Sequence, residues 1–341
     1  MTRRVRLVDI AERLNITKVS VSKALRDHPD ISRETRALVK KTAAEMGYSP
    51  NLVARSLSSR KSNVIGVVVP KIAHTFFSSV IDAVQEHATE NGYGILLAVS
   101  NERSDLEKEA IERLLAMRVD GLLVSVSQQR PDLAIYDKVR EMRVPLVFFD
   151  RAVEDLPFSS VTVDDRGGAR LAVEKLIESG CRNIAHIAGS LSTNIGRDRL
   201  AGYEDALQAG GIALDPSLVV DGGFDERHGY EACKRILSGG RKPDSIFCVS
   251  FPVGLGARAA LTETNPDLLG RVQIAAFGDG GMGDFYTYPH YCVRQPVREL
   301  GTRAVALLLE EIEADQLGEY GESLRHEVLD TELIVPRGMP A

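Results

Sequence analysis

The sequence predicts a small all-α head followed by a larger α/β body of two lobes, and three observations support this. Apolar residues in the head recur at helical spacing, whereas after residue 63 short apolar runs alternate with amphipathic stretches. At 341 residues, the chain is too long for one ordinary core. Charge is also uneven: residues 1–62 hold 14 Lys and Arg against 6 Asp and Glu, yet the whole chain carries −6. The basic head is therefore a candidate phosphate-binding surface on an acidic body.

The head is expected to consist of short helices joined by tight turns. Residues 7–14 and 18–25 each place their apolar side chains on one face. A third helix is expected to begin after Ser32, a favourable N-cap, and to end near Gly47. A short fourth helix is expected after Pro50, before a linker rich in Ser, Lys and Arg.

The body alternates strands and helices in a way that is typical of parallel sheets buried on both faces. The expected strands lie in the runs NVIGVVVP, GILLAVS, DGLLVSVS, PLVFFD, SSVTVDD, NIAHIAG, LVVDGG, SIFCVS and QIAAFGD. Two successive α/β units accommodate so many strands better than one sheet does. We expect the break between the units near residues 150–160.

Residues 9–26, DIAERLNITKVSVSKALR, fit a helix-turn-helix. This motif needs a small residue where two helices cross, a turn residue that tolerates positive φ, and an apolar residue on the second helix. Ala11, Asn15 and Val21 stand at those places. The second helix would then present hydroxyl, ammonium and methyl groups to phosphates and base edges, from Thr17, Lys18, Val19, Ser20, Ser22 and Lys23. An ordinary helical hairpin is the alternative interpretation.

The chain resembles the lactose/galactose-repressor (LacI/GalR) family over its head and its body. The segment VRLVDIAERLNITKVSVSKAL, with ISRETRALVKKTAAEMGYSPNLVARSL after it, carries the resemblance in the head. The motifs IGVVVP, DGLLVS, FFDRA, GRDRLAGY and PVRELGTRAVALLL extend it through the body. The resemblance implies a body of two Rossmann-like lobes, like a periplasmic sugar-binding protein, with a ligand between the lobes. The expected domains are a helix-turn-helix domain at 1–49, a hinge helix and linker at 50–62, and an effector-binding and dimerisation domain at 63–341. Within the last domain, one lobe is expected at about 63–160 plus 293–322. The other lobe is expected at about 161–292 plus 323–341.

The resemblance also implies how the head binds double-stranded operator DNA as a homodimer. Lys18 and Val19 match the two positions that largely set operator preference. Lys23 stands where the family often has Arg, and a lysine reaches a guanine acceptor only as a point donor. Leu57 matches a leucine that wedges into the central base step and kinks the DNA. The remaining residues that match the minor-groove hinge helix are Asn51, Val53, Ala54, Arg55 and Ser56. No heptad tail follows LIVPRGMPA, so a dimer is expected rather than a tetramer.

In the body, the resemblance and the general rule for open α/β sheets place a ligand at the carboxyl ends of the strands. Matching positions nominate Phe76, Phe77, Asp150, Arg199, Phe224, Ser250, Phe251 and Asp279. Phe224 is expected to stack on a sugar or base face, and Arg199 to donate two hydrogen bonds to hydroxyls or to an anionic group. Core packing is the alternative for the phenylalanines, and a lobe-bridging salt bridge is the alternative for Asp150 and Arg199.

The chain departs from the usual pattern at two places in the body. Ser250 and Phe251 replace a frequent Asn-Asp pair, and Gly278 replaces a carboxylate that usually binds sugar hydroxyls. The residues SF at 250–251 and FGD at 277–279 resemble the fructose-repressor branch of the family more closely, and the signals of that branch are phosphorylated sugars. We therefore expect a sugar or a phosphorylated or acidic sugar derivative as effector. A non-sugar metabolite, or a phosphorylated carrier protein acting as co-repressor, remains the alternative.

Other classes of function find little support in the sequence. The segment GLGARA begins too late after its strand for dinucleotide binding, and the glycines are expected inside a helix. Asp164 and Asp165 are adjacent on an expected strand and would point to opposite faces, which argues against a catalytic pair. No metal or cofactor site is expected from the seven histidines and four cysteines. We expect a cytoplasmic, nucleoid-associated bacterial regulator with no membrane span and no secretory signal, rather than an enzyme or a transport protein.

Overall fold

The chain forms two compact units, residues 1–62 and 63–341. A computed structural model describes residues 5–48, 61–240, 242–264, 266–278, 290–318, 320–321 and 323–335. Among these residues, no helix is long and apolar enough to cross a membrane.

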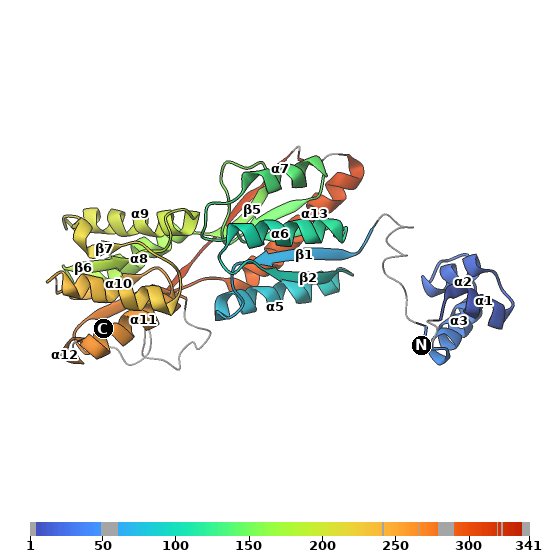
Figure 1. Ribbon diagram of the computed structural model, residues 1–341, viewed down its shortest axis with the longest axis horizontal. Helices are drawn as coiled ribbons and strands as arrows, with labels where there is room; N and C mark the ends of the chain where they lie inside the picture. The colour runs from blue at the N-terminus through green and yellow to red at the C-terminus, as the bar shows by residue number, and fades with distance from the viewer. Residues whose placement is uncertain are drawn as a thin grey trace. The chain divides into compact units, whose positions relative to one another are not determined.

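The head is built from α1 (Leu7–Leu14), α2 (Lys18–Leu25) and α3 (Arg33–Glu45) around a small core (Figure 1). Ala11 on α1 and Val21 on α2 are both buried in this core. Asn15 ends α1 in the left-handed region, with φ of 53°, which Asn tolerates better than most residues. Thr17 caps α2 by accepting a hydrogen bond from the backbone N–H of Ser20 at 3.0 Å. The predicted helix-turn-helix is therefore confirmed.

The body contains two six-stranded sheets, one in each lobe (Figure 1). The first has the order β11-β5-β4-β3-β1-β2, formed by β1 (Val64–Val69), β2 (Gly94–Val99), β3 (Gly121–Val124), β4 (Leu146–Phe149), β5 (Ser159–Val163) and β11 (His326–Leu329). The second has the order β12-β10-β9-β8-β6-β7, formed by β6 (Ile184–Ile187), β7 (Val219–Val220), β8 (Ser245–Cys248), β9 (Gln273–Phe277), β10 (Tyr291–Arg294) and β12 (Glu332–Ile334). The strands pair in parallel, except that β12 is antiparallel to β10.

Helices cover both faces of each sheet, so each lobe has two apolar cores. The first sheet lies between α5 (Thr75–Glu90) with α13 (Val297–Leu317) and α6 (Ser104–Ala116) with α7 (Leu133–Glu141). The second lies between α8 (Asp165–Glu178) with α9 (Asn194–Ala209) and α10 (Glu226–Ser238) with α11 (Phe251–Thr264). The short α12 (Pro266–Leu269) and the 3-10 turn Pro216–Leu218 complete the second lobe. Burial on both faces explains the continuous apolar runs in the sequence.

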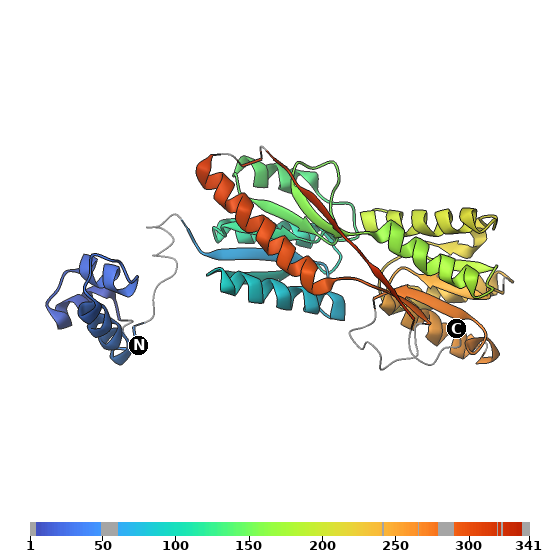
Figure 2. The same ribbon diagram turned by 180° about the vertical axis from the view of Figure 1, so that it is seen from behind.

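The chain passes between the lobes three times: after β5, after β10 and between β11 and β12, the last seen from behind in Figure 2. These crossings correct the expected lobe boundaries. All of β5 belongs to the first lobe, and β10 belongs to the second. The expected assignment of 323–341 to the second lobe is wrong for β11, because it pairs with β5 in the register His326↔Ser160. The expected strand in LVVDGG shrinks to the two residues of β7.

Candidate functional site

The outward face of α2 presents Lys18 and Val19. Val19 is 64% exposed, so its side chain is accessible on this face. Among the residues that the structure describes, no hydrogen bond or ion pair holds the side chain of Lys18. By contrast, Lys23 Nζ donates a hydrogen bond to Asp30 Oδ2 at 2.7 Å. The two residues predicted to set operator preference are therefore free to meet DNA, whereas Lys23 already has a partner.

The hydroxyl groups predicted to contact DNA also have partners within the head. Thr17 Oγ1 and Ser20 Oγ lie 2.9 Å apart at the start of α2. Arg26 Nη2 donates to Ser22 Oγ at 3.2 Å, and its Nε donates to the carbonyl oxygen of Ser22 at 3.1 Å. Hydroxyl groups that both donate and accept retain bonding capacity for a phosphate. The hinge residues that the resemblance nominates lie outside the described residues: Asn51, Val53, Ala54, Arg55, Ser56 and Leu57.

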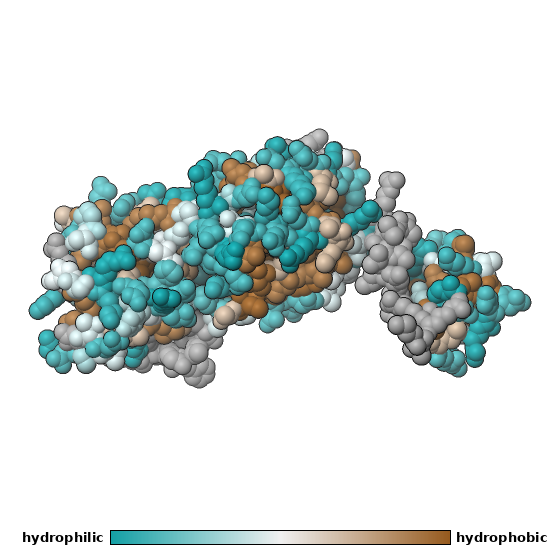
Figure 3. Space-filling view, in the orientation of Figure 1, coloured by the Kyte–Doolittle hydropathy of each residue, from teal (hydrophilic) through white to brown (hydrophobic). Residues whose placement is uncertain are grey.

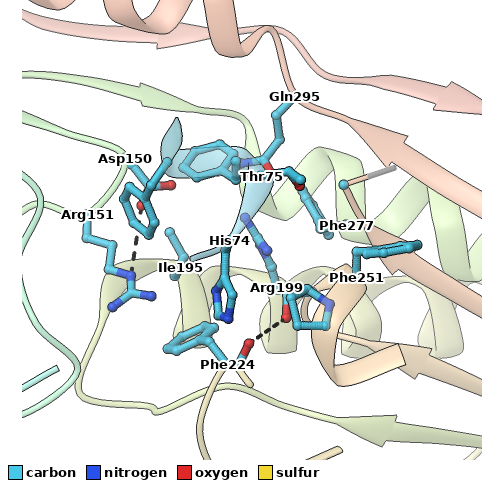
Figure 4. Close-up of a pocket in the computed structure, with 15 residues that line it drawn as sticks. His74, Thr75, Asp150, Arg151, Ile195, Arg199, Phe224, Phe251, Phe277 and Gln295 are labelled. Atoms are coloured by element: carbon cyan, nitrogen blue, oxygen red, sulfur yellow. Dashed lines mark hydrogen bonds and ion pairs between the residues drawn. The ribbon is translucent and has the colours of Figure 1, made fainter. Parts of the chain in front are cut away.

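A pocket lies between the lobes of the body (Figure 4). Its lining segments follow the carboxyl ends of β1, β4, β6, β7, β8, β9 and β10, drawn from both sheets. The lining residues are His74, Thr75, Phe76, Phe77, Asp150, Arg151, Ile195, Arg199, Phe224, Ser250, Phe251, Pro252, Phe277, Gly278 and Gln295. The pocket therefore occupies the position that open α/β sheets use for ligands.

Arg199, on α9, is buried at the base of this pocket. Its Nε donates to Asp165 Oδ1 at 2.7 Å, its Nη2 lies 2.6 Å from the same oxygen, and its Nη1 donates to the carbonyl oxygen of Val249. The guanidinium also stacks on Phe277, with Cζ 3.6 Å from the ring centroid. A guanidinium has five N–H groups, so one hydrogen on each terminal nitrogen is left for a ligand.

Arg151 is a second guanidinium in the pocket, and it directly follows Asp150 at the end of β4. Its Nη1 donates to Glu102 Oε2 at 2.8 Å, inside a site where both side chains are nearly inaccessible. Its Nε is buried with no hydrogen-bond partner among the described residues, although Asp150 Oδ2 lies 3.9 Å away. The guanidinium lies over the ring of Phe224, with Cζ 4.3 Å from the centroid. An unpaired buried N–H is costly, so this nitrogen lacks the acceptor that a buried donor usually has.

Two buried carboxyl groups accompany these guanidiniums. Burial raises the pKa of Asp165 to about 7, although the Arg199 guanidinium opposes the shift. Burial likewise raises the pKa of Asp150, against the pull of Arg151 and Arg199. Asp150 also has a positive φ of 60° and accepts a hydrogen bond from Ser125 Oγ at 3.2 Å. Near neutral pH these carboxyl groups therefore hold protons more readily than exposed aspartates do.

Aromatic rings form the walls of the pocket. Phe76 and Phe77 meet edge to face at the start of α5, with their centroids 5.1 Å apart. Phe77 lines the pocket and is also part of the core of the first lobe, as the alternative of core packing predicts. Phe224 faces the pocket from the second lobe, where Ser250 Oγ donates to its carbonyl oxygen at 3.1 Å. These faces suit the apolar face of a sugar ring.

Polar contacts join the two lobes beside the pocket. Asn194 Oδ1 accepts a hydrogen bond from the backbone N–H of Ala152 at 3.3 Å, and Asn194 Nδ2 donates to the carbonyl oxygen of Asp150 at 3.4 Å. Ser190 Oγ donates to the carbonyl oxygen of Gln128 at 3.2 Å. The β6–α9 segment of the second lobe therefore holds the ends of β3 and β4 in the first.

Seven of the eight nominated effector residues line the pocket, and Asp279 lies outside the described residues. The expected effector residues did not include the other eight that line the pocket: His74, Thr75, Arg151, Ile195, Pro252, Phe277, Gly278 and Gln295. Arg151 and Gln295 directly follow Asp150 and Arg294 at strand ends, so the position of the strands could have indicated them. Ile195 lies one turn before Arg199 on α9, and helical spacing could have indicated it.

The pair Asp164-Asp165 and the segment GLGARA both have structural roles in helices of the second lobe. Asp164 and Asp165 do not lie on a strand as expected: Asp164 caps α8 by accepting from the backbone N–H of Gly167 at 2.8 Å, and Asp165 is the first helical residue. The glycines of GLGARA lie inside α11 as predicted. A side chain at Gly256 would strike the backbone of Glu226 on α10, so this glycine serves close helix packing.

The described residues contain no group of three or more His, Cys, Asp or Glu that could hold a metal ion. Cys181, Cys233, Cys248 and Cys292 are all buried free thiols. Burial raises the pKa of Cys233 to about 12, so this thiol is unreactive at neutral pH.

Comparison with known families matches both parts of the chain. Residues 6–51 match the model of bacterial regulatory proteins of the lacI family. Residues 62–324 match the model of periplasmic binding proteins and the sugar-binding domain of the LacI family. The repressor PurR of Haemophilus influenzae (strain PittEE) is 30% identical over 307 residues, which cover 89% of this chain and 90% of PurR. The regulator RegA of Clostridium saccharobutylicum is 28% identical over 95% of this chain and 97% of its own length.

Solved structures show the same architecture. The lac repressor dimer bound to operator and an anti-inducer has a TM-score of 0.83 and 26% identity, and the match covers 97% of this chain and 98% of the repressor. The regulator CelR in complex with cellobiose has a TM-score of 0.72 and 29% identity, with 97% and 99% covered. These relatives are transcriptional regulators and not enzymes. The chain belongs to the LacI family of DNA-binding transcriptional repressors, with a helix-turn-helix head and a ligand-binding body.

Proposed function

We propose that the chain represses genes of carbohydrate metabolism as a dimer on a pseudo-palindromic operator, and that a sugar derivative in the pocket between the lobes controls its affinity for DNA. One observation carries this proposal: aromatic faces and two guanidiniums line a single pocket to which both lobes contribute. Aromatic faces accept sugar rings, and guanidiniums accept anionic groups.

The charged groups favour a phosphorylated or acidic sugar over a neutral one. Arg151 Nε is buried without a partner, and Arg199 keeps N–H groups beyond those used by Asp165 and Val249. Gly278 contributes no carboxylate to this pocket. Burial raises the pKa of Asp150, so this carboxyl group opposes an anionic ligand less than an exposed aspartate would.

The placement of the pocket supports allosteric control. A ligand there touches His74, Asp150 and Arg151 of the first lobe, and Arg199 and Phe224 of the second. It therefore stabilises one arrangement of the lobes over others, and the difference in its affinity for these arrangements sets the change in operator affinity. Such coupling typically amounts to about 1–3 kcal/mol. We expect release from DNA on effector binding, the commoner outcome in the family that the sequence resembles.

An exposed apolar strand supports the dimer. β2 is an edge strand of the first sheet, and Leu96 and Leu97 on it are 39% and 41% exposed. Figure 3 shows apolar side chains gathered over β2 and α5 on the face in view. Proteins usually cover such an edge, and a second copy of the chain would do so.

The proposal is tested by calorimetric titration of the full-length chain with hexoses and with their phosphates. We expect the phosphate of at least one sugar to bind at least tenfold more tightly than the free sugar. The same ligand must change the affinity for an operator duplex selected from a random library. Equal or tighter binding of the neutral sugar would overturn the acidic-effector proposal. Binding of only a non-sugar metabolite, or a response only to a phosphorylated carrier protein, would identify one of the alternative signals.

A further inference from the structure

The side chain of Lys23 is held by an acidic residue from the loop between α2 and α3. Lys23 Nζ donates to Asp30 Oδ2 at 2.7 Å, and 34% of the lysine side chain and 58% of the aspartate side chain are exposed. Lys23 lies four residues after Val19, so both side chains lie along the same outward face of α2. A carboxylate is therefore positioned beside a cation predicted to meet DNA.

This contact differs from those of the neighbouring cations. In the described part of the head, Lys18 has no ion-pair partner, and Arg26 bonds only to the neutral Ser22. Lys23 alone among these three cations of α2 and its C-cap is paired with a carboxylate. The hydrogen bond from Lys23 lowers the pKa of Asp30, with a smaller effect from His28, so the carboxylate is ionised near neutral pH. Asp30 thus opposes the attraction of phosphates for this lysine.

We propose that Asp30 is a specificity-determining residue that acts through Lys23, holding Nζ away from phosphates on non-specific DNA while leaving it able to donate to a base acceptor. This inference rests on the DNA-binding role of the head. An ammonium group has three N–H donors, so Nζ keeps two after bonding to Asp30. At the correct sequence, one of these donors reaches a base while Asp30 fixes the direction of the side chain. On other sequences, the exposed phosphates of the DNA attract Lys23 no more strongly than the carboxylate of Asp30 does.

The chain supplies a matched control. Asp27, in the same loop, accepts a hydrogen bond from Lys40 Nζ at 2.7 Å, and its side chain is likewise 58% exposed. Lys40 belongs to α3 rather than to α2. Asp27→Asn and Asp30→Asn therefore remove the same charge from the same loop, but only Asp30→Asn releases Lys23.

The experiment titrates the full-length protein against two duplexes of equal length and base composition, one selected by the wild type from a random library and one scrambled. All titrations use one buffer and one pH, because His28 Nδ1 also lies 3.4 Å from Asp30 Oδ2. We expect Asp30→Asn to tighten binding to the scrambled duplex about three- to fivefold, the upper part of the range for one exposed ion pair. The logarithmic salt slope on that duplex should steepen by about 0.9, equivalent to one more phosphate contact. Binding to the selected duplex should change by less than about twofold.

Asp27→Asn should leave the ratio of the two affinities unchanged, and Asp30→Asn should have no effect on it in a Lys23→Met background. Equal tightening on both duplexes, or the same effect in the Lys23→Met background, would overturn the inference and indicate a general charge effect. Thermal unfolding by circular dichroism verifies that each head is folded. Failure of the wild type to select any sequence would contradict the DNA-binding role itself, which is a different outcome.

Discussion

The guanidinium of Arg151 lies over the ring of Phe224, 4.3 Å from its centroid, and so joins a residue of the first lobe to one of the second. Glu102 holds this guanidinium through Nη1 and accepts a hydrogen bond from the backbone N–H of Gln128 at 2.8 Å. The carbonyl oxygen of Gln128 accepts from Ser190 of the second lobe. The pocket is therefore bordered by a continuous series of contacts that connects both lobes.

Replacing Arg151 tests this connection together with the proposed anionic effector. Arg151→Gln should lower the affinity for the phosphorylated sugar at least tenfold, because the buried cation and its unpaired Nε are lost. The affinity for the neutral sugar should fall less. Calorimetry of both ligands gives the two ratios. An equal loss for both ligands would mean that Arg151 acts only by holding the lobes together.

Arg199→Ala should remove most of the preference for the acidic ligand over the matching neutral sugar. The variant also leaves Asp165 buried without its partner, so the free energy of unfolding should fall by about 3 kcal/mol or more. Arg199→Lys retains the charge but not the forked geometry, and should bind the ligand with intermediate affinity. A variant that is folded and keeps full discrimination would contradict the assignment of Arg199 to the effector site.

The pKa of Asp165 predicts a pH dependence of stability. This carboxyl group titrates near 7 in the folded chain and near 3.8 in its unperturbed state, so between these values the folded state binds the proton more strongly. The free energy of unfolding should therefore fall as the pH rises from about 4 to about 7, by at most about 1.4 kcal/mol per pH unit. Denaturant unfolding of the wild type and of Asp165→Asn at pH 5, 6, 7 and 8 isolates this contribution. A difference between the two proteins that stays constant with pH would contradict the shift.

The dimer can be tested at β2. Leu97→Lys places a charge on the exposed edge strand and should convert the protein to a monomer with weaker operator binding. Leu133→Lys on α7, where the leucine is 46% exposed, is the matched control and should remain dimeric. Sedimentation velocity at micromolar concentration distinguishes the two states. A dimeric Leu97→Lys protein would place the interface elsewhere.

Lys18 and Val19 should govern the sequence of the preferred half-site, because both are exposed on α2. Exchanging both residues should change the duplex that the protein selects from a random library, with each lost base contact costing about 1–3 kcal/mol.

Leu57→Ala should instead weaken operator binding without changing the half-site sequence or the effector affinity, because a wedging leucine acts on the bending of the DNA. An unchanged selected sequence, or unimpaired binding by Leu57→Ala, would contradict the respective assignment.

Local sequence patterns predicted the parts of the fold that depend on local chemistry. Helical spacing and capping predicted α1 to α3, and apolar runs predicted the parallel strands. Seven of the nominated effector residues line one pocket because strand ends in such sheets converge. The pairing of His326 with Ser160 could not be predicted, because no local signal links residues so distant in sequence. The Lys23–Asp30 contact likewise depends on how the loop after α2 folds back.

The three passages between the lobes determine when each part of the chain can fold during synthesis. The core of the first lobe includes Leu300, Ala304 and Leu308 of α13, and its edge is completed by β11. A ribosome must therefore make nearly the whole second lobe before the first lobe can complete this core, whereas its core under α6 and α7 needs no residue of α13. The head has its own core within residues 5–48, so it needs no later part of the chain to fold. A nascent chain thus acquires its DNA-reading helix well before it has the pocket that regulates it.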